Sequence, residues 1–329
     1  GGGHRIHSKT IMDGVCAICT GILVGTQLWK QYQIMDQSSN YYVRLYGLLH
    51  LQKLPQESIL IVKGDVITNS IRYLQQCEGK RPDVQHFDQS MMTYKWFVTK
   101  QARHFREIIF PNQVYNPYTE DGYAMETFLD RNALNASRPV YLCGGWYHDE
   151  GSAKSGGGIP GFQTWPVSTC DRIREEGDTP TVSQWIEEME ELAFEYPTPS
   201  VQKYGEETWE RVTYNDYWMA KHKIPMTLLE YSTENNFNQE ALQHAAARFE
   251  DLILSHPDPP DYFYRNAAIS FGRLRMAGSQ CRMVANFANF LLVTDENAAD
   301  SATRDVGTMV RNFVIFSQLL STGENGASG

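Results

Sequence analysis

The sequence lacks the excess of positive charge that a nucleic-acid-binding protein needs. Its 329 residues include 29 lysines and arginines against 39 aspartates and glutamates, for a formal net charge of −10 at pH 7. We therefore expect no nucleic-acid partner, because such binding displaces counterions with basic side chains. A disordered chain is also excluded, since 42% of the residues are hydrophobic and 12% are aromatic. The length predicts a globular protein of about two domains.

Short motifs of nucleotide binding and hydrolysis are also missing. The sequence contains no P-loop, no G-x-S-x-G nucleophile elbow and no H-E-x-x-H zinc motif. Cys16 and Cys19 form one C-x-x-C pair without a second pair of ligands, so no metal site is predicted. We assign no catalytic residue, no metal and no bound cofactor to this chain.

Cysteines are few, at six in the whole chain. Four of them lie far apart in the sequence and are the disulfide candidates: Cys77, Cys143, Cys170 and Cys281. If the chain lies in an oxidising compartment, these four allow three pairings, and the sequence does not choose among them.

No hydrophobic run reaches the roughly 20 residues of a typical membrane-spanning helix. Residues 11–29 are the longest candidate, with one charge, Asp13, near the start. We favour a membrane helix, perhaps the last of several, and take residues 1–30 as that helix and its flank. A buried core helix and a cleaved signal peptide are the alternatives. The initial Gly and the lack of a small-residue cleavage site argue against a signal peptide.

Charges around this run predict on which side of a membrane the rest of the chain lies. Arg5 and Lys9 precede the run and only Lys30 follows it closely, which favours a cytoplasmic N-terminal side. Everything after residue 30 would then be lumenal or extracellular. Asn135, in an Asn-Ala-Ser sequon, is a candidate for N-glycosylation on that side.

Residues 31–175 are expected to form an α/β domain with a small parallel sheet. Residues 58–62 and 82–87 are typical of β-strands, and residues 69–77 between them are typical of a helix. Strand, helix and strand within roughly 30 residues indicate a βαβ unit. A further strand is expected at residues 139–143, followed by a stretch rich in loops.

Residues 176–329 are expected to be all-helical. The helical pattern covers residues 183–196, 206–221, 239–255 and 262–276. An Ala-x-Phe pattern with apolar residues three and five positions after the Phe begins at residue 247 and again at residue 285, an offset of 38. Helix-pair arrays have periods of about 34 to 47 residues, so TPR-like repeats are predicted. Two unrelated amphipathic helices remain the alternative.

The loop after the first expected strand is the candidate ligand site. Open parallel sheets bind ligands at the carboxyl ends of their strands, and Lys63-Gly64-Asp65 lies at such an end. The ligand-binding candidates are Asp65, Asn69 and Arg72, and the helix N-terminus there favours an anionic group. The residues alone favour a simpler alternative, in which Asp65 and Asn69 cap the helix and Arg72 forms a solvated ion pair.

Five stretches of the sequence together resemble a known family. They are residues 59–97, 110–117, 164–171, 208–225 and 264–268. The stretches look like the C-terminal region of the transmembrane protein 260 family of protein O-mannosyltransferases of the endoplasmic reticulum. The resemblance runs from about residue 14 to about residue 276, is densest over residues 57–97, and is weaker over the last fifty residues.

The resemblance implies a multi-pass membrane glycosyltransferase of the GT-C type. Such enzymes transfer mannose from dolichyl-phosphate-mannose to Ser or Thr of the IPT domains (immunoglobulin-like, plexin and transcription factor domains) of plexin-type receptors. Their catalytic acid lies in an early lumenal loop that no part of this sequence matches. The resemblance therefore implies the last membrane helix plus a lumenal, TPR-like part that docks the acceptor.

Other functions compete with this interpretation. A non-enzymatic lumenal binding or scaffold protein with helical repeats is the main alternative. A self-contained sugar-binding enzyme is disfavoured, because the sequence offers no assignable pair of acid and base.

Overall fold

The computed structural model describes residues 3–105, 107–134, 138–148, 150 and 158–294. Contacts divide the chain into two compact units, residues 1–41 and residues 42–329. The division expected between residues 175 and 176 therefore lies inside the larger unit.

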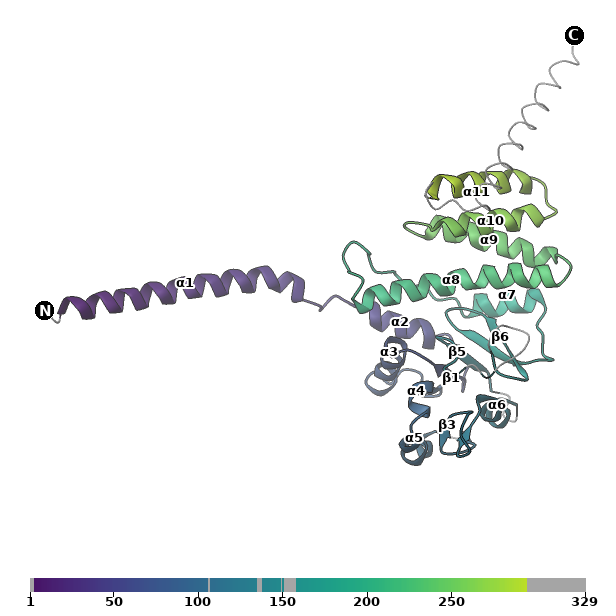
Figure 1. Cartoon of the computed structure of the whole chain (residues 1–329), viewed down its shortest axis with the longest axis horizontal. Coiled ribbons are helices and arrows are strands. Elements are labelled where there is room, and N and C mark those ends of the chain that lie inside the picture. The colour runs from purple at the N-terminus through teal and green to yellow at the C-terminus, as the bar shows by residue number, and fades with distance from the viewer. Residues whose placement is uncertain (1–2, 106, 135–137, 149, 151–157, 295–329) are drawn as a thin grey trace, which may run out of the picture. The chain divides into compact units, whose positions relative to one another are not determined.

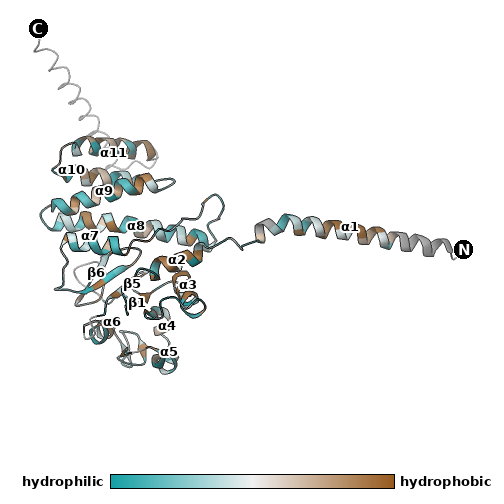
Figure 2. Ribbon diagram, turned by 180° about the vertical axis from the view of Figure 1, so that it is seen from behind, coloured by the Kyte–Doolittle hydropathy of each residue, from teal (hydrophilic) through white to brown (hydrophobic). Residues whose placement is uncertain are grey.

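Helix α1 (Gly3–Met35) makes up most of the smaller unit. It contains one stretch, Met12–Tyr32, that is long and apolar enough to cross a membrane, with a mean hydropathy of 1.3. Apolar residues recur along α1 (Figure 2), and none of this stretch is buried.

The larger unit contains a five-stranded sheet with strand order β2-β1-β5-β7-β6. The strands are β1 (Ile59–Val62), β2 (Gln85–Asp88), β5 (Val140–Cys143), β6 (Phe162–Pro166) and β7 (Asp171–Glu175). β1 pairs in parallel with β2 and with β5, and α3 (Asp65–Gln76) connects β1 to β2, so the predicted βαβ unit is confirmed.

The sheet is mixed, which corrects the predicted parallel sheet. β7 runs antiparallel to both β5 and β6, so a hairpin extends the sheet beyond β5. The hairpin was not predicted, because the stretch after Cys143 is rich in glycine and polar residues and was expected to form loops. The strand β7 is also rich in charge, and its arginines are neutralised by pairing, with Arg174 2.9 Å from Glu188.

Six further helices of the larger unit surround or extend the sheet. They are α2 (Tyr42–Leu51), α7 (Val182–Glu191), α8 (Trp209–Glu234), α9 (Gln239–Ser255), α10 (Asp261–Arg273) and α11 (Ser279–Val293). Figure 1 shows α8, α9, α10 and α11 stacked in succession, each against the next, at one end of this unit. The predicted helices are present, and the predicted all-helical C-terminal region is confirmed over the described residues.

Helix α8 is longer than predicted. It continues past Pro225 to Glu234, whereas the helical pattern was expected to end at residue 221. A proline inside a helix costs about 3 kcal/mol. Burial of Leu228 and Leu229 beyond the proline offsets this cost.

The two copies of the 38-residue pattern lie on α9 and α11. Phe249 and Phe287 are both buried, while Leu254 and Leu292 are 82% and 83% exposed. Corresponding positions of the two helices therefore have corresponding surroundings. Two helices do not establish a TPR array, so the TPR-like repeat stays a prediction.

The sheet is covered on both faces, which explains why β1 is apolar throughout. Leu60 and Val62 contribute to a core shared with α2, α3 and α7 to α10, whereas Ile59 and Ile61 contribute to a second core. Alternate side chains of a strand point to opposite faces, so a strand buried on both faces has no polar position. The first core continues across the predicted domain boundary.

The chain between β2 and β5 builds the second core. Its elements are α4 (Gln89–Met92), α5 (Lys95–Gln101), a 3₁₀ turn (Ala102–His104), β3 (Val114–Tyr115), β4 (Gly122–Tyr123), α6 (Met125–Leu129) and a π-helical turn (Asp130–Leu134). This connection brings the chain from one side of β1 to the other. The carboxyl ends of β1 and β5 therefore lie where the strand order reverses, which is where open sheets bind ligands.

Candidate functional site

Two clefts of small-molecule size lie on the larger unit. The first, called here the strand-end cleft, has a volume of about 840 Å³ and lies at the carboxyl ends of β1 and β5. The second, called here the sheet-edge cleft, has a volume of about 630 Å³ and lies beside β2. Both volumes fall in the range of about 300–1,000 Å³ that is usual for ligand pockets.

Glycines shape the floor of the strand-end cleft. Gly64 lies in the loop that follows β1 and has a φ angle of +122°. Gly144 lies in the loop that follows β5 and has a φ angle of +80°. A Cβ atom on Gly144 would lie 2.0 Å from the carbonyl oxygen of Lys63. Only glycine therefore allows the two loops to approach each other so closely.

Helix α8 supplies one wall of the strand-end cleft. The residues of α8 that line it are Trp209, Val212, Asp216, Met219, Ala220, His222, Lys223 and Met226. Trp209, Val212, Asp216, Met219, Lys223 and Met226 recur at intervals of three and four, and such positions share one face of a helix. This spacing is visible in the sequence, although it does not show what the face packs against.

Polar groups of α2 and α8 meet around Tyr46. The hydroxyl of Tyr46 donates a hydrogen bond to Asp216 Oδ2 at 3.1 Å, and the carbonyl oxygen of Tyr46 lies 2.7 Å from His50 Nδ1. A carbonyl only accepts, so Nδ1 carries the proton and Nε2 of His50 is left as an acceptor. Burial lowers the pKa of His50 to about 4, so the ring is neutral near pH 7. Burial also raises the pKa of Asp216, against a smaller opposing effect of the Tyr46 hydrogen bond.

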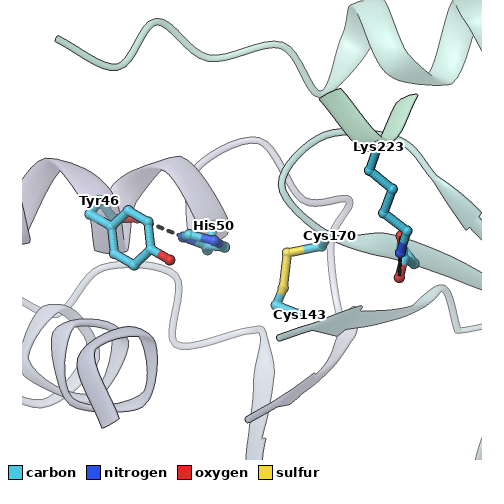
Figure 3. Close-up of a disulfide and its surroundings, with 6 residues drawn as sticks. Tyr46, His50, Cys143, Cys170 and Lys223 are labelled. Carbon is cyan, nitrogen blue, oxygen red and sulfur yellow. Dashed lines mark hydrogen bonds and ion pairs between the residues drawn. A yellow bond between two sulfur atoms is a disulfide. The ribbon is translucent and has the colours of Figure 1, made fainter. Parts of the chain in front are cut away.

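An ion pair lines this cleft, and a disulfide joins two segments that border it. Lys223 Nζ lies 2.6 and 2.5 Å from the two carboxylate oxygens of Asp171, whose side chain is only 9% exposed. Cys143, the last residue of β5, is joined to Cys170, which precedes β7 (Figure 3). The bridge thereby links the loop at Gly144 to the turn before Asp171, and both line the cleft.

The sheet-edge cleft combines an open strand edge with aromatic side chains. Trp96 and Phe97 of α5 line it, and Trp96 is 44% exposed and stacks on Tyr94 with ring centres 6.2 Å apart. β2 is the last strand of the sheet on this side. The backbone N–H of Gln85 donates to Ser58. Alternation along a parallel strand therefore turns the backbone N–H and C=O of His86 toward the cleft.

Charged and polar side chains also line the sheet-edge cleft. Arg72 reaches within 4.0 Å of the Asp88 carboxylate. His86 is half-buried, and its buried Nε2 atom has no hydrogen-bond partner in the described part of the chain. Burial lowers the pKa of His86 to about 3, and the charge of Arg72 adds to this effect.

The structure separates the three predicted ligand-binding residues. Asp65 lines the strand-end cleft, Arg72 lines the sheet-edge cleft, and Asn69 is exposed on α3 and lines neither. The expectation that Asp65 or Asn69 caps the helix is wrong, because α3 begins at Asp65, its N-cap is Gly64, and no side chain caps it. The helix thus starts four residues before the predicted residue 69.

Sequence reasoning identified the strand end but missed most of the cleft around it. His50, Asp171, Asp216 and Lys223 come from α2, β7 and α8, and the hydrogen bond from Tyr46 to Asp216 spans 170 residues. Only the tertiary fold brings these groups together. No group of three or more His, Cys, Asp or Glu side chains able to hold a metal occurs among the described residues.

The four disulfide candidates divide into one bridge and two free thiols. Cys143 and Cys170 are joined, with Cα atoms 4.4 Å apart. Cys77 and Cys281 are exposed and unbonded. The predicted glycosylation residue Asn135 lies outside the described residues.

Known proteins resemble most of this chain. Residues 44–127 match a family model described as TMEM260-associated domain 2. The chain is 27% identical over 279 residues to "Protein O-mannosyl-transferase TMEM260" of Mus musculus, an alignment that covers 79% of this chain. It is 28% identical over 272 residues to "Protein O-mannosyl-transferase tmem260" of Dictyostelium discoideum, covering 82% of this chain. The resemblance seen in the sequence is thereby confirmed.

The matches cover only part of each relative. The chain spans 39% of the mouse protein and 32% of the Dictyostelium protein. The matched domain at residues 44–127 includes every residue that lines the sheet-edge cleft. No solved structure matches the chain.

Proposed function

We propose that this chain, a relative of the TMEM260 proteins, is the lumenal C-terminal part of a protein O-mannosyltransferase of the endoplasmic reticulum membrane. The observation that carries the proposal is the similarity to two proteins named as O-mannosyltransferases, over 79% and 82% of this chain. The role of this part is to hold the protein acceptor. We take the acceptors to be IPT domains of plexin-type receptors, as the family resemblance implies.

Two features support a lumenal position behind a membrane helix. Residues Met12–Tyr32 of α1 have the length and composition of a membrane span. The larger unit contains the disulfide Cys143–Cys170, and disulfides persist in oxidising compartments such as the lumen of the endoplasmic reticulum. Together they favour an anchor at α1 with the larger unit on the lumenal side.

The sheet-edge cleft is the proposed docking surface. An extended segment can add to an open strand edge through backbone hydrogen bonds, while side-chain pockets beside the edge provide selectivity. β2 offers the backbone groups of His86, and Trp96 and Phe97 offer apolar contacts beside them. IPT domains are built from β-strands, so an edge strand of the acceptor matches this surface. The stack α8–α11, which we propose to be TPR-like, extends the surface available to a folded acceptor.

Catalysis is assigned to a part of the enzyme outside this chain. Transfer from dolichyl-phosphate-mannose needs a base to take the proton of the Ser or Thr hydroxyl, which is typically carboxylate chemistry. The family resemblance places the catalytic carboxylate in an early lumenal loop that this sequence does not match. The present chain therefore binds the acceptor, and the donor is bound elsewhere in the enzyme.

A transfer assay tests the proposal. Mannose transfer from labelled dolichyl-phosphate-mannose to a purified IPT domain would be measured for the longer protein that contains this chain and for the chain alone. We expect transfer by the longer protein, and acceptor binding without transfer by the chain. Turnover by the chain alone would refute the assignment of catalysis. Acceptor binding with no transfer by either protein would support the alternative of a non-enzymatic binding or scaffold protein.

A further inference from the structure

We infer that the strand-end cleft binds a neutral hexose, held by the carboxylate and imidazole acceptors and by the aromatic surface of its lining. The inference concerns a different cleft from the one proposed to dock the acceptor. It therefore goes beyond the proposed function and does not depend on it.

Three open polar groups of this cleft are hydrogen-bond acceptors, and the Thr169 hydroxyl, which can donate as well as accept, also has no partner in the described part of the chain. The Asp65 carboxylate makes no side-chain hydrogen bond or ion pair within the described part of the chain, and neither does Oδ1 of Asp216. Nε2 of His50 is likewise an acceptor without a partner among the described residues, because Nδ1 carries the proton (Figure 3). A ligand that satisfies all three must bring donors, and vicinal hydroxyl groups do so.

An anionic ligand does not fit this set of groups. The cleft is lined by three carboxylates and two lysines, and both lysines already have partners. Lys223 is paired with Asp171, and Lys63 Nζ donates to the carbonyl oxygen of Trp146 at 2.8 Å. Asp65 also lies in the first turn of α3, where its charge balances the positive end of the helix dipole. The earlier expectation of an anionic group at this helix is therefore disfavoured.

Apolar surface in the same cleft matches the C–H face of a pyranose ring. The side chains of Trp209 and Tyr262 line the cleft, and they are 58% and 39% exposed. Met219, also in the lining, is 70% exposed. Aromatic faces of this kind stack on the C–H groups of a sugar, while its hydroxyls reach the acceptors. A cleft of about 840 Å³ has room for such a ring.

Saturation-transfer NMR titration of the full 329-residue chain in detergent micelles tests the inference. Methyl α-mannopyranoside is the probe, with inorganic phosphate and choline as anionic and cationic probes. We expect saturable binding of the hexoside and no saturable binding of phosphate or choline. Asp216→Asn should weaken hexoside binding about 10- to 100-fold, as expected for loss of a hydrogen bond to a charged group. Trp209→Ala should weaken it about tenfold or more, because the stacking surface is lost.

Trp96→Ala is the matched control, because Trp96 is also an exposed tryptophan but lies in the sheet-edge cleft. It should leave the hexoside affinity unchanged. Equal unfolding midpoints of the variants would show that they remain folded. The inference is overturned if the folded chain binds no hexoside, if Trp96→Ala and Trp209→Ala weaken binding equally, or if phosphate or choline saturates the cleft instead. No donor lipid or acceptor protein is present, so failure here is distinct from failure of the proposed function.

Discussion

Replacing both Cys143 and Cys170 by serine should lower the free energy of unfolding by about 3.5 kcal/mol, and the structure gives the magnitude. The bridge joins residues separated by 27 positions in the sequence. The chain-entropy relation for a loop of that length gives about 3.5 kcal/mol, because the cross-link restricts the unfolded chain. The bridge also holds the two loops that form one wall of the strand-end cleft, so hexoside binding should weaken as well.

Urea unfolding followed by tryptophan fluorescence measures this loss, with extrapolation to water. The matched control replaces Cys77 and Cys281 by serine, because both are exposed and unbonded. That control should change the free energy of unfolding by no more than about 0.5 kcal/mol. A reducing agent should destabilise the native chain and the control but leave the Cys143/Cys170 variant unchanged. Equal stability of the two double variants would refute the reasoning, since it would mean that no bridge stabilises the fold.

Three further predictions concern single residues. Gly144→Ala should destabilise by about 1–3 kcal/mol more than Gly145→Ala in urea unfolding. Both residues have positive φ, but only at Gly144 would a Cβ meet a backbone carbonyl, at 2.0 Å. The free energy of unfolding should fall as the pH drops from 6.5 toward 4, by on the order of 3 kcal/mol for His50, because its pKa is about 4 when folded and 6.5 when unfolded. His50→Asn should reduce this slope without abolishing it, since the pKa of His86 is also lowered, to about 3. Arg81→Lys should cost about 2 kcal/mol, because lysine cannot donate at once to the four carbonyls near the end of α2 that the guanidinium contacts.

Each of these predictions has a result that would contradict it. Equal stability of the two glycine variants would mean that the loops at the ends of β1 and β5 do not approach closely. An unchanged slope of stability against pH in His50→Asn would mean that the imidazole is not held neutral by burial. An Arg81→Lys variant as stable as the native chain would mean that the guanidinium does not support the end of α2.

The sequence was sufficient to predict the βαβ unit and the helical region because their signals are local. The apolar run at β1, the loop with Gly64 and the strand at β2 all lie within one short stretch, and β1 is buried on both faces. The same local rule failed at β7, where charges hide the strand. There Arg174 pairs with Glu188 of α7, and Ile173 is the one apolar side chain that the strand adds to the core.

Local signals also could not delimit α8 or assemble the strand-end cleft. A proline usually ends a helix, but α8 continues past Pro225 because the residues beyond it are buried in the core. The cleft draws on α2, α3, α8 and α10, and nothing in the sequence indicates that these helices meet at the end of β1. Asp65 was found because it follows that strand directly, whereas Asp216 requires knowledge of how α8 packs.

The binding of an isolated IPT domain to this chain tests most directly the central claim that it holds the acceptor. Biolayer interferometry would compare the native chain with Trp96→Ala and Trp209→Ala, two exposed tryptophans in different clefts. The account predicts that the native chain binds, that Trp96→Ala weakens binding about tenfold or more, and that Trp209→Ala leaves it unchanged. Absence of binding, or equal binding by the native chain and Trp96→Ala, would contradict it.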